Sequence, residues 1–444
     1  MIRIALMTLR NFDPSRREIL AGLAALASGS VVGGATPAST VRLGLQARPA
    51  TLALRAGQPP SAISELAAPT AGTDVRLARG ARVELALRND LPVPVAPVWY
   101  GLDGTAVPGP LLGRATATGT TESSVFSISH AGTLMADLRL FEASLKVPVR
   151  PLPVIVQESE PVAVDRDEVF LVEDWRLAPD GAATVPGTAG ADIAPVFTVN
   201  GKLAPKLILR VNERLRLRLI NGCQRAVIAV KFEGAEVLVM ALDGQPAEPF
   251  PARNGAVVLA PGGRADVFLD GTAPGAAAPV LLHDGQAARQ VAQLVTSTEP
   301  PARPSRLATP APLPSNGLPA NLDLRGALRF DVALAAADGS GWTHPASFSQ
   351  SAAPAFRAKA GRTLVLALKN PGPVATVFHL HGHHFRLLDR LDDGWKPYWL
   401  DTLAIEPGQT QRIAFAANSP GRWLIQSVAT DWNAPRLVRW YMVE

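Results

Sequence analysis

Residues 214–220 read RLRLRLI, with arginine and leucine in strict alternation. Side chains of a β-strand point to opposite faces in turn, so this pattern is typical of a strand with one apolar face. We expect the leucines to face a core and the arginines to face water. Similar short runs recur at residues 82–89, 256–270 and 362–370, separated by Gly, Pro, Asn and Asp. Many short strands with such turns predict an all-β chain of sandwich domains.

The chain has 444 residues, which is too long for one sandwich. A proline-dense segment without hydrophobic periodicity, residues 297–320, is typical of a linker. A weaker division lies near residue 157. The runs RVELALRND, RLRLRLING and TLVLALKN each occur once in the three resulting segments. This repetition predicts three copies of one sandwich, namely domain 1 (41–157), domain 2 (158–296) and domain 3 (321–444).

Composition excludes several classes of protein. Hydrophobic residues make up 47% of the chain and charged residues 18%, which is too apolar for a disordered protein. The formal net charge is +5, and part of this excess lies in the first forty residues, so we expect no nucleic-acid partner. The single cysteine, Cys223, excludes an intramolecular disulfide and any multi-cysteine metal site, and we expect it to be buried.

The N-terminus contains paired arginines, Arg16 and Arg17, directly before an apolar run at residues 19–34. Glycines and serines interrupt that run, so it is too short for a membrane helix and predicts no permanent anchor. The SRRxxL pattern resembles a twin-arginine export signal. We therefore predict that residues 1–40 are a signal and that the protein is periplasmic. The alternative is a basic leader on a cytoplasmic protein.

The run His379-Leu-His-Gly-His-His384 follows an expected strand and holds four of the seven histidines. Alternation would place His379, His381 and His383 on one face, where imidazoles can converge on one metal ion. Three lone histidines, His130, His283 and His344, have no paired neighbour in the sequence. For these we expect surface positions or satisfied hydrogen bonds.

Motifs in all three segments carry a resemblance to one family. FHLHGHHF, WLDT and EPGQTQRIAFAANSPGRWLI resemble the third cupredoxin domain of the multicopper oxidases, which include the laccases. EDWRL, FTVNG, RLRLINGC and LAPGGRADVFLD resemble the second domain, and VELALRNDLPV, WYGLDG and AGTL the first. The resemblance implies three tandem cupredoxin-like Greek-key β-sandwich domains.

Active members of that family bind a trinuclear copper cluster through four His-x-His pairs. Aligning the motifs retains one pair, His379 and His381. The other three pairs fall on Val98 and Tyr100, on Asp137 and Arg139, and on Gln426 and Val428. The blue-copper ligands, two histidines and a cysteine, fall on Thr376, Ser427 and Trp432, with Leu437 at the axial position.

Without a thiolate the blue site has no route for electrons, so oxidase activity is not expected. We expect no cofactor, or copper if any, with His379 and His381 as candidate metal ligands and His383 or His384 as a third. The alternative is that these histidines are structural. For the emptied pocket we predict a metal-free polar network of Tyr100, Asp137, Arg139 and Gln426 with the two histidines, because unpaired buried groups are costly.

A second cluster, DDGWKPYWLDT, concentrates Trp395, Tyr398 and Trp399 beside two aspartates. It predicts either core packing or a protein-partner site on domain 3. We therefore interpret the chain as an exported multicopper-oxidase relative that acts as a binding or scaffold protein. It resembles the copper-depleted branch with cell-envelope and division roles. The alternative is a copper-binding oxidoreductase, or a metal-binding protein that uses HLHGHH.

Overall fold

The computed structural model describes residues 40–69, 72–104, 115–188, 190–334, 341–348, 352–389 and 394–444. Residues 1–39 of the predicted export signal lie outside these residues, whereas Thr40 begins the first strand. Within them, helical structure is limited to three short 3-10 turns, η1 (Arg139–Ser144), η2 (Arg253–Gly255) and η3 (Pro345–Ser347). None of the described helices has the length and apolar character needed to cross a membrane. The all-β prediction is confirmed.

Domain 1 consists of two sheets with strand orders β6-β4-β1-β2-β8 and β3-β9-β7-β5. Its core is a cluster of buried residues from both sheets. Its strands are β1 (Thr40–Leu52), β2 (Ser61–Ala67), β3 (Val75–Ala78), β4 (Arg82–Asn89), β5 (Val98–Tyr100), β6 (Thr121–Ser127), β7 (Gly132–Asp137), β8 (Val149–Arg150) and β9 (Leu152–Gln157).

Domain 2 has sheets of order β11-β10-β13-β18-β15-β16 and β12-β20-β19-β14-β17, with a core of its own. Its strands are β10 (Arg166–Trp175), β11 (Val196–Val199), β12 (Lys206–Leu209), β13 (Arg214–Asn221), β14 (Ile228–Phe232), β15 (Leu238–Leu242), β16 (Gln245–Pro251), β17 (Ala256–Leu259), β18 (Arg264–Asp270), β19 (Ala277–His283) and β20 (Ala288–Thr296).

Domain 3 has sheets of order β21-β23-β27-β25 and β22-β29-β28-β24-β26 around a third core. Its strands are β21 (Leu328–Ala333), β22 (Arg357–Ala358), β23 (Thr363–Lys369), β24 (Thr376–Leu380), β25 (Arg386–Leu387), β26 (Thr402–Ile405), β27 (Thr410–Ala416), β28 (Gly421–Ala429) and β29 (Arg436–Val443).

The repeated sequence runs occupy the same place in each sandwich. β4, β13 and β23 each pair in parallel with the first strand of their domain, β1, β10 and β21. Each run also ends in a buried asparagine, Asn89, Asn221 or Asn370. The chain therefore contains three copies of one cupredoxin-like topology.

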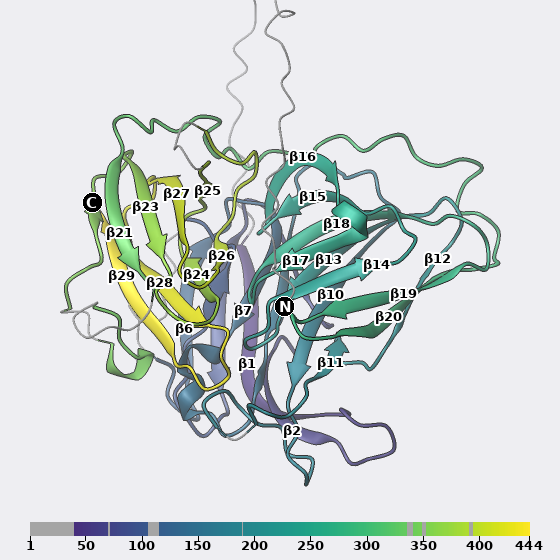
Figure 1. Ribbon diagram of the computed structural model, residues 1–444, viewed down its shortest axis with the longest axis horizontal. Coiled ribbons are helices and arrows are strands. Elements are labelled where there is room, and N and C mark those ends of the chain that lie inside the picture. Colours follow the sequence, from purple (N-terminus) through teal and green to yellow (C-terminus); the bar gives the residue numbers. More distant parts are fainter. Residues whose placement is uncertain are drawn as a thin grey trace, which may run out of the picture.

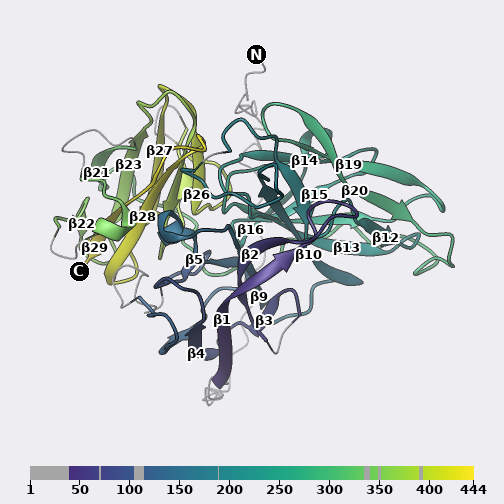
Figure 2. The same ribbon diagram turned by 90° about the horizontal axis from the view of Figure 1, so that it is seen from below.

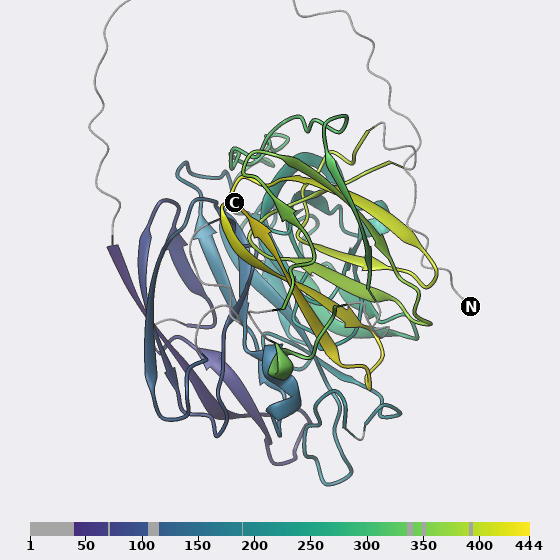
Figure 3. The same ribbon diagram turned by 90° about the vertical axis from the view of Figure 1, so that its left-hand side faces the viewer.

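The three domains lie side by side (Figures 1 and 2). A shared cluster of apolar side chains lies where they meet. We call this cluster the junction core. Its buried members are Val98, Tyr100, Met135, Leu140, Ile155, Val169, Leu171, Ile220, Leu424 and Val438. Domain 1, in purple and blue, lies beside both other domains, and Figure 3 shows it next to domain 3. Because all three domains contribute side chains, the junction core fixes how they are arranged.

The strand RLRLRLI differs from its predicted pattern. Every residue of β13 is buried, including its arginines, and Arg218 is fully inaccessible to water. The arginine face lies against domain 1, and Arg218 donates to Thr133 of that domain at 2.9 Å. Within domain 2, Arg218 also donates to Asp167 at 2.6 and 2.7 Å. The expectation of a wet face was wrong. Carboxylates supplied by other segments replace the water that the guanidinium groups would otherwise bind.

Residues 297–327, which include the predicted linker, contain no helix or strand. The segment is nevertheless anchored. Leu313 is buried against Met240 and Phe268 of domain 2. The Asn316 side chain exchanges hydrogen bonds of 2.9 and 2.8 Å with the backbone of Ala131 in domain 1. The chain thus contacts both preceding domains before it enters domain 3.

Candidate functional site

Short strands bring the former copper positions to the junction between domains 1 and 3. In domain 1, β5 pairs with β7, so Val98 lies opposite Asp137. In domain 3, β24 pairs with β28, so His379 lies directly opposite Gln426. All of these side chains are buried. The backbone therefore retains the arrangement that the sequence motifs imply, and the side chains decide its chemistry.

His381 links domain 3 to domain 1 through both ring nitrogens. Its Nδ1 lies 3.2 Å from the carbonyl oxygen of Trp99, which can only accept, so Nδ1 carries the proton. Its Nε2 is then an acceptor, and the Gln426 amide lies 2.7 Å away as the donor. Arg436 in turn donates to Gln426 Oε1 at 2.9 Å. This histidine has no lone pair left for a metal ion.

His379 is hydrogen-bonded within domain 3, and its ring packs beside Tyr100 of domain 1. The Thr402 hydroxyl donates to Asp401 at 2.7 Å, so it accepts from His379 Nδ1 at 3.0 Å. The Tyr100 ring lies 5.0 Å from the His379 ring and 5.4 Å from the His381 ring. Burial lowers the pKa of both histidines, to about 4 for His381. Both rings are therefore neutral at neutral pH.

Arg139 and Asp137 form a buried ion pair that points toward domain 2. Arg139 Nε lies 2.6 Å from Asp137 Oδ2, and Nη1 donates to the carbonyl oxygens of Gly222 and Cys223 at 2.8 and 3.0 Å. Burial opposes the charge of Arg139, but Asp137 outweighs it, so the pKa of Arg139 is raised. Among the described residues, the pair makes no hydrogen bond with His379 or His381. The single network predicted from the sequence is thus divided into separate groups.

Arg436 and Glu142 complete the junction, and sequence reasoning missed both. Glu142, in η1 of domain 1, accepts from Arg225 of domain 2 at 2.5 and 3.2 Å and lies 3.5 Å from Arg436 Nη2. Burial raises the pKa of Glu142, but the positive charges of Arg225 and Arg436 lower it by more. The pKa of Glu142 is therefore below its ordinary value. Three domains therefore meet at one carboxylate. The sequence gives no sign of this pairing because the three residues lie in different segments.

His383 and His384 point to different surroundings. His383 Nδ1 lies 2.7 Å from the Tyr441 hydroxyl, which donates to the carbonyl of His381, and its Nε2 accepts from Ser419 N at 3.3 Å. Burial lowers the pKa of His383 to about 4. His384 Nδ1 lies 2.6 Å from Asp103 Oδ1 in domain 1. Neither residue turns toward the pair His379 and His381 as a third ligand.

The residues at the cluster position do not fit copper ions. Four of the six substituted positions carry Val, Arg or Gln, which supply no ligand suited to copper, and Asp137 is neutralised by Arg139. Burial raises the pKa of Tyr100, so its phenol stays neutral and is a poor metal ligand. Of the two remaining histidines, His381 uses both nitrogens in hydrogen bonds. Two buried guanidinium groups, Arg139 and Arg436, act electrostatically on Tyr100, and each is paired with a carboxylate, Asp137 or Glu142, which is therefore not free to bind a metal ion.

The blue-copper position does not fit copper either. Ser427 uses its hydroxyl to donate to the carbonyl of Leu334, and Trp432 is buried with Arg176 stacked 4.4 Å from its ring centre. A cavity of about 310 Å³ opens here, lined by Thr376, Ser427 and Leu437 together with Leu334, Pro373 and Val374. The space where the thiolate would lie is largely apolar.

The aromatic cluster of domain 3 is mostly packed. Trp399 is buried in a small cluster with Leu322 and Val365, and Arg386 lies 4.7 Å from its ring centre. Tyr398 approaches Phe250 of domain 2, with ring centres 6.5 Å apart. Trp395 is partly buried against the same cluster as Trp399. Trp399 thus has the core role, whereas Asp392 and Asp393 lie outside the described residues.

Comparisons with known proteins agree with this architecture. Residues 321–444 match the family model described as multicopper oxidase. The chain is 24% identical over 423 residues to the multicopper oxidase MmcO of Mycobacterium tuberculosis, covering 80% of this chain and 78% of that protein.

Solved structures show the same fold. A multicopper oxidase from Pseudomonas thermotolerans has a TM-score of 0.76 and 24% identity, covering 92% of this chain and 100% of that chain. Lac15 from a marine microbial metagenome has a TM-score of 0.73 and 24% identity, covering 91% and 100%. The fold is that of the three-domain multicopper oxidases. The chain is therefore similar to the multicopper oxidases in fold over most of its length, and its residues 321–444 match their family model.

Proposed function

We propose that this protein is a non-catalytic member of the multicopper oxidase family that works in the periplasm as a binding or scaffold protein. The observation that carries the proposal is the hydrogen-bonded chain Trp99–His381–Gln426–Arg436 at the cluster position. It uses a retained copper-ligand histidine to join two domains. A side chain committed to structure in this way is not available for redox chemistry.

The electron route of an oxidase is also missing. A blue-copper centre accepts electrons through a copper–thiolate bond, and Ser427 stands at that position. Cys223 does not replace the missing thiolate. It is buried in the core of domain 2, and burial raises the pKa of its thiol well above the usual value. A neutral buried thiol is a poor metal ligand.

The cavity at the former blue-copper position supports a binding role. Ligand sites are concave, mostly apolar and about 300–1,000 Å³ in volume, and this cavity has about 310 Å³. Thr376 and Asp431 add polar groups to its wall. A small apolar molecule, or an apolar side chain of a partner protein, suits such a site. This role for domain 3 is in keeping with the resemblance to copper-depleted cell-envelope relatives.

The experiment that tests the proposal is copper reconstitution. The purified mature chain is incubated with Cu²⁺, freed of excess metal, and assayed for intense blue absorption and for oxidation of phenols and aromatic amines. We expect neither signal. A known oxidase of the family, treated in parallel, controls the loading step. Copper-dependent turnover that persists after repurification would contradict the proposal and favour a copper-binding oxidoreductase.

A further inference from the structure

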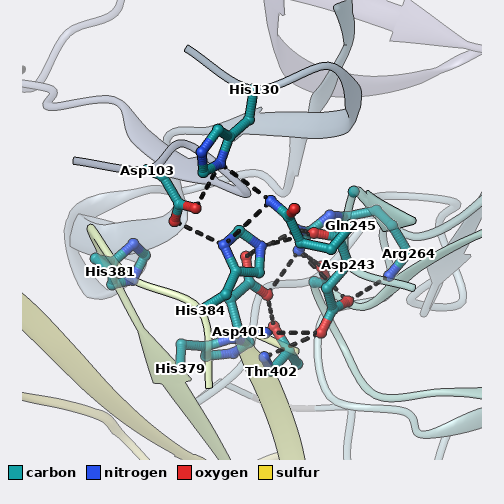
Figure 4. A network of polar contacts seen from close by, with 12 residues as sticks. Asp103, His130, Asp243, Gln245, Arg264, His379, His381, His384, Asp401 and Thr402 are labelled. Atoms are coloured by element: carbon teal, nitrogen blue, oxygen red, sulfur yellow. Dashed lines mark hydrogen bonds and ion pairs between the residues drawn. The ribbon is translucent and has the colours of Figure 1, made fainter. Parts of the chain in front are cut away.

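Three potential metal ligands meet beside the former cluster, at the contact of domains 1 and 3. Among the described residues, the ligand atoms of Asp103, His130 and His384 all lie within 4.8 Å of one another. His384 Nδ1 lies 2.6 Å from Asp103 Oδ1, and His130 Nδ1 lies 2.6 Å from Asp103 Oδ2. Figure 4 shows this group, with His379 and His381 outside it. It shares no residue with the retained pair.

Neighbouring groups fix the orientation of the ligands. His384 Nε2 lies 2.9 Å from the carbonyl oxygen of Asp243, which can only accept, so Nε2 carries a proton and Nδ1 faces Asp103. This is the arrangement that carbonyl groups impose on metal-binding histidines in proteins. Gln245 is fixed as well, because its Oε1 accepts from Asn316 at 3.0 Å.

The contacts within the group cannot all be hydrogen bonds at the same time. The Gln245 amide nitrogen, a donor, lies 3.2 Å from His130 Nδ1 and 3.4 Å from His384 Nδ1, which calls for lone pairs on both rings. The Asp103 carboxylate calls for protons on the same atoms. Asp103 Oδ2 is buried, and its 2.6 Å contact with His130 Nδ1 lacks hydrogen-bond geometry, so no hydrogen bond within the described part of the chain satisfies this oxygen. A cation between the carboxylate and the rings would satisfy all three ligand atoms.

Charge and space also favour a cation. Two further carboxylates, Asp243 and Asp401, lie beside the group in Figure 4, and one guanidinium, Arg264, pairs with Asp401. A cavity of about 270 Å³ opens directly onto Asp103, His130 and His384. It supplies an entry path and room for a water ligand. Zinc bonds of about 2.0–2.1 Å need donor atoms roughly 3.3 Å apart, so the 2.6 Å contacts would open by less than 1 Å.

We propose that Asp103, His130 and His384 bind one divalent first-row transition ion, with Zn²⁺ as the cation that suits two imidazoles and a carboxylate. The carboxylate and the two Nδ1 atoms are the protein ligands. The side toward the cavity is left for water, as in zinc sites with three protein ligands. This zinc site is separate from the binding or scaffold role proposed above. Zinc has no redox chemistry, so the site does not imply oxidase activity.

The test uses the mature chain, stripped with a chelator and titrated with Zn²⁺ in a calorimeter, with metal content measured after dialysis. We expect one Zn²⁺ per chain. His130 is partly exposed, so His130→Ala should keep the fold and lower zinc affinity at least tenfold. His344→Ala, at an exposed lone histidine, is the matched control and should leave affinity unchanged. Thermal unfolding of each variant without metal checks folding.

Two outcomes would overturn the proposal. One is a folded wild-type chain that takes up no stoichiometric zinc. The other is zinc uptake that survives both His130→Ala and Asp103→Asn but is lost in His379→Ala, which would assign the metal to the retained pair instead. Neither result depends on oxidase activity, so failure here leaves the copper-reconstitution test of the proposed function unaffected.

Discussion

Asn89, Asn221 and Asn370 perform one task three times. In each, Oδ1 accepts the backbone N–H two residues ahead, and Nδ2 donates to two carbonyl oxygens, at 2.8 to 2.9 Å for the donated bonds. The accepting contacts are 2.9 to 3.0 Å long. The side chain therefore closes the turn that follows the repeated strand, which explains why each sequence run ends in asparagine.

Replacing one of these asparagines should be costly. We expect Asn370→Ala to lower the free energy of unfolding by about 2–4 kcal/mol, because it leaves several buried backbone groups unpaired. Calorimetry of the mature chain measures the loss. Asn418→Ala, at an exposed asparagine of the same domain, is the control and should change stability by about 0.5 kcal/mol or less. Equal effects of the two substitutions would contradict this role.

Glu142 predicts a dependence of stability on acid. Its pKa is lowered below the ordinary value of 4.5 in the folded protein, because Arg225 and Arg436 outweigh the effect of burial. A carboxyl with a depressed folded pKa stabilises the fold above its unfolded pKa and loses that contribution as pH falls through the folded value. The melting temperature should therefore drop as the pH falls below about 4.5.

The matched variant is Glu142→Gln. It should be less stable than wild type at neutral pH by about 3–5 kcal/mol, because two buried arginines lose their carboxylate. Its melting temperature should fall less steeply on acidification. Parallel pH curves for the two proteins would mean that another carboxyl controls acid stability.

At the scale of the element, β13 shows what alternation does and does not reveal. Its period of two predicts a strand correctly, and its leucines do face the domain 2 core. The pattern does not distinguish a face turned to water from one turned to another domain, since arginine is compatible with both. Asp167, Asp266 and Thr133 decide the outcome, and they lie 48 to 85 residues away from Arg218.

Removing an arginine from this strand should loosen domain 1 from domain 2. We expect Arg218→Ala to cost about 3–5 kcal/mol, because Asp167 loses its buried partner and Thr133 of domain 1 loses a hydrogen bond from domain 2, whereas Asp266 keeps Arg216. Calorimetry and limited proteolysis report the loss. Arg42→Ala is the control, since the Arg42 side chain is 90% exposed beside Glu84 and such pairs contribute about 0–1 kcal/mol. Comparable losses from both would show that burial of β13 contributes nothing.

The candidate site could be predicted from the sequence only in part. The HLHGHH run and the replaced positions identify which residues stand where copper ligands would be, because they are defined by local motifs. The partners of those residues are set by domain packing. Trp99 and His381 are 282 residues apart, and Glu142 and Arg436 are 294 apart. His130 has no paired neighbour in the sequence, and domain packing likewise supplies its partner, Asp103.

At the scale of the whole molecule, the predicted export route can be tested directly. Replacing Arg16 and Arg17 together with lysine should leave unprocessed precursor in the cytoplasm, because the paired arginines resemble the recognition element of the twin-arginine signal. Cell fractionation with an antibody against the mature chain measures the distribution. Replacing Arg3 and Arg10 with lysine is the control. Normal periplasmic accumulation of the double variant at Arg16 and Arg17 would reject the signal.

The junction core makes the stability of each domain depend on its contacts with the other two. Its apolar side chains come from all three domains, so a domain separated from the other two would expose an apolar surface to water. A chain cut between residues 297 and 320 should therefore keep its halves associated rather than yield independent modules. The same feature makes it difficult for evolution to exchange one domain for another sandwich domain. The replacement domain would need an apolar surface that packs against both of the remaining domains.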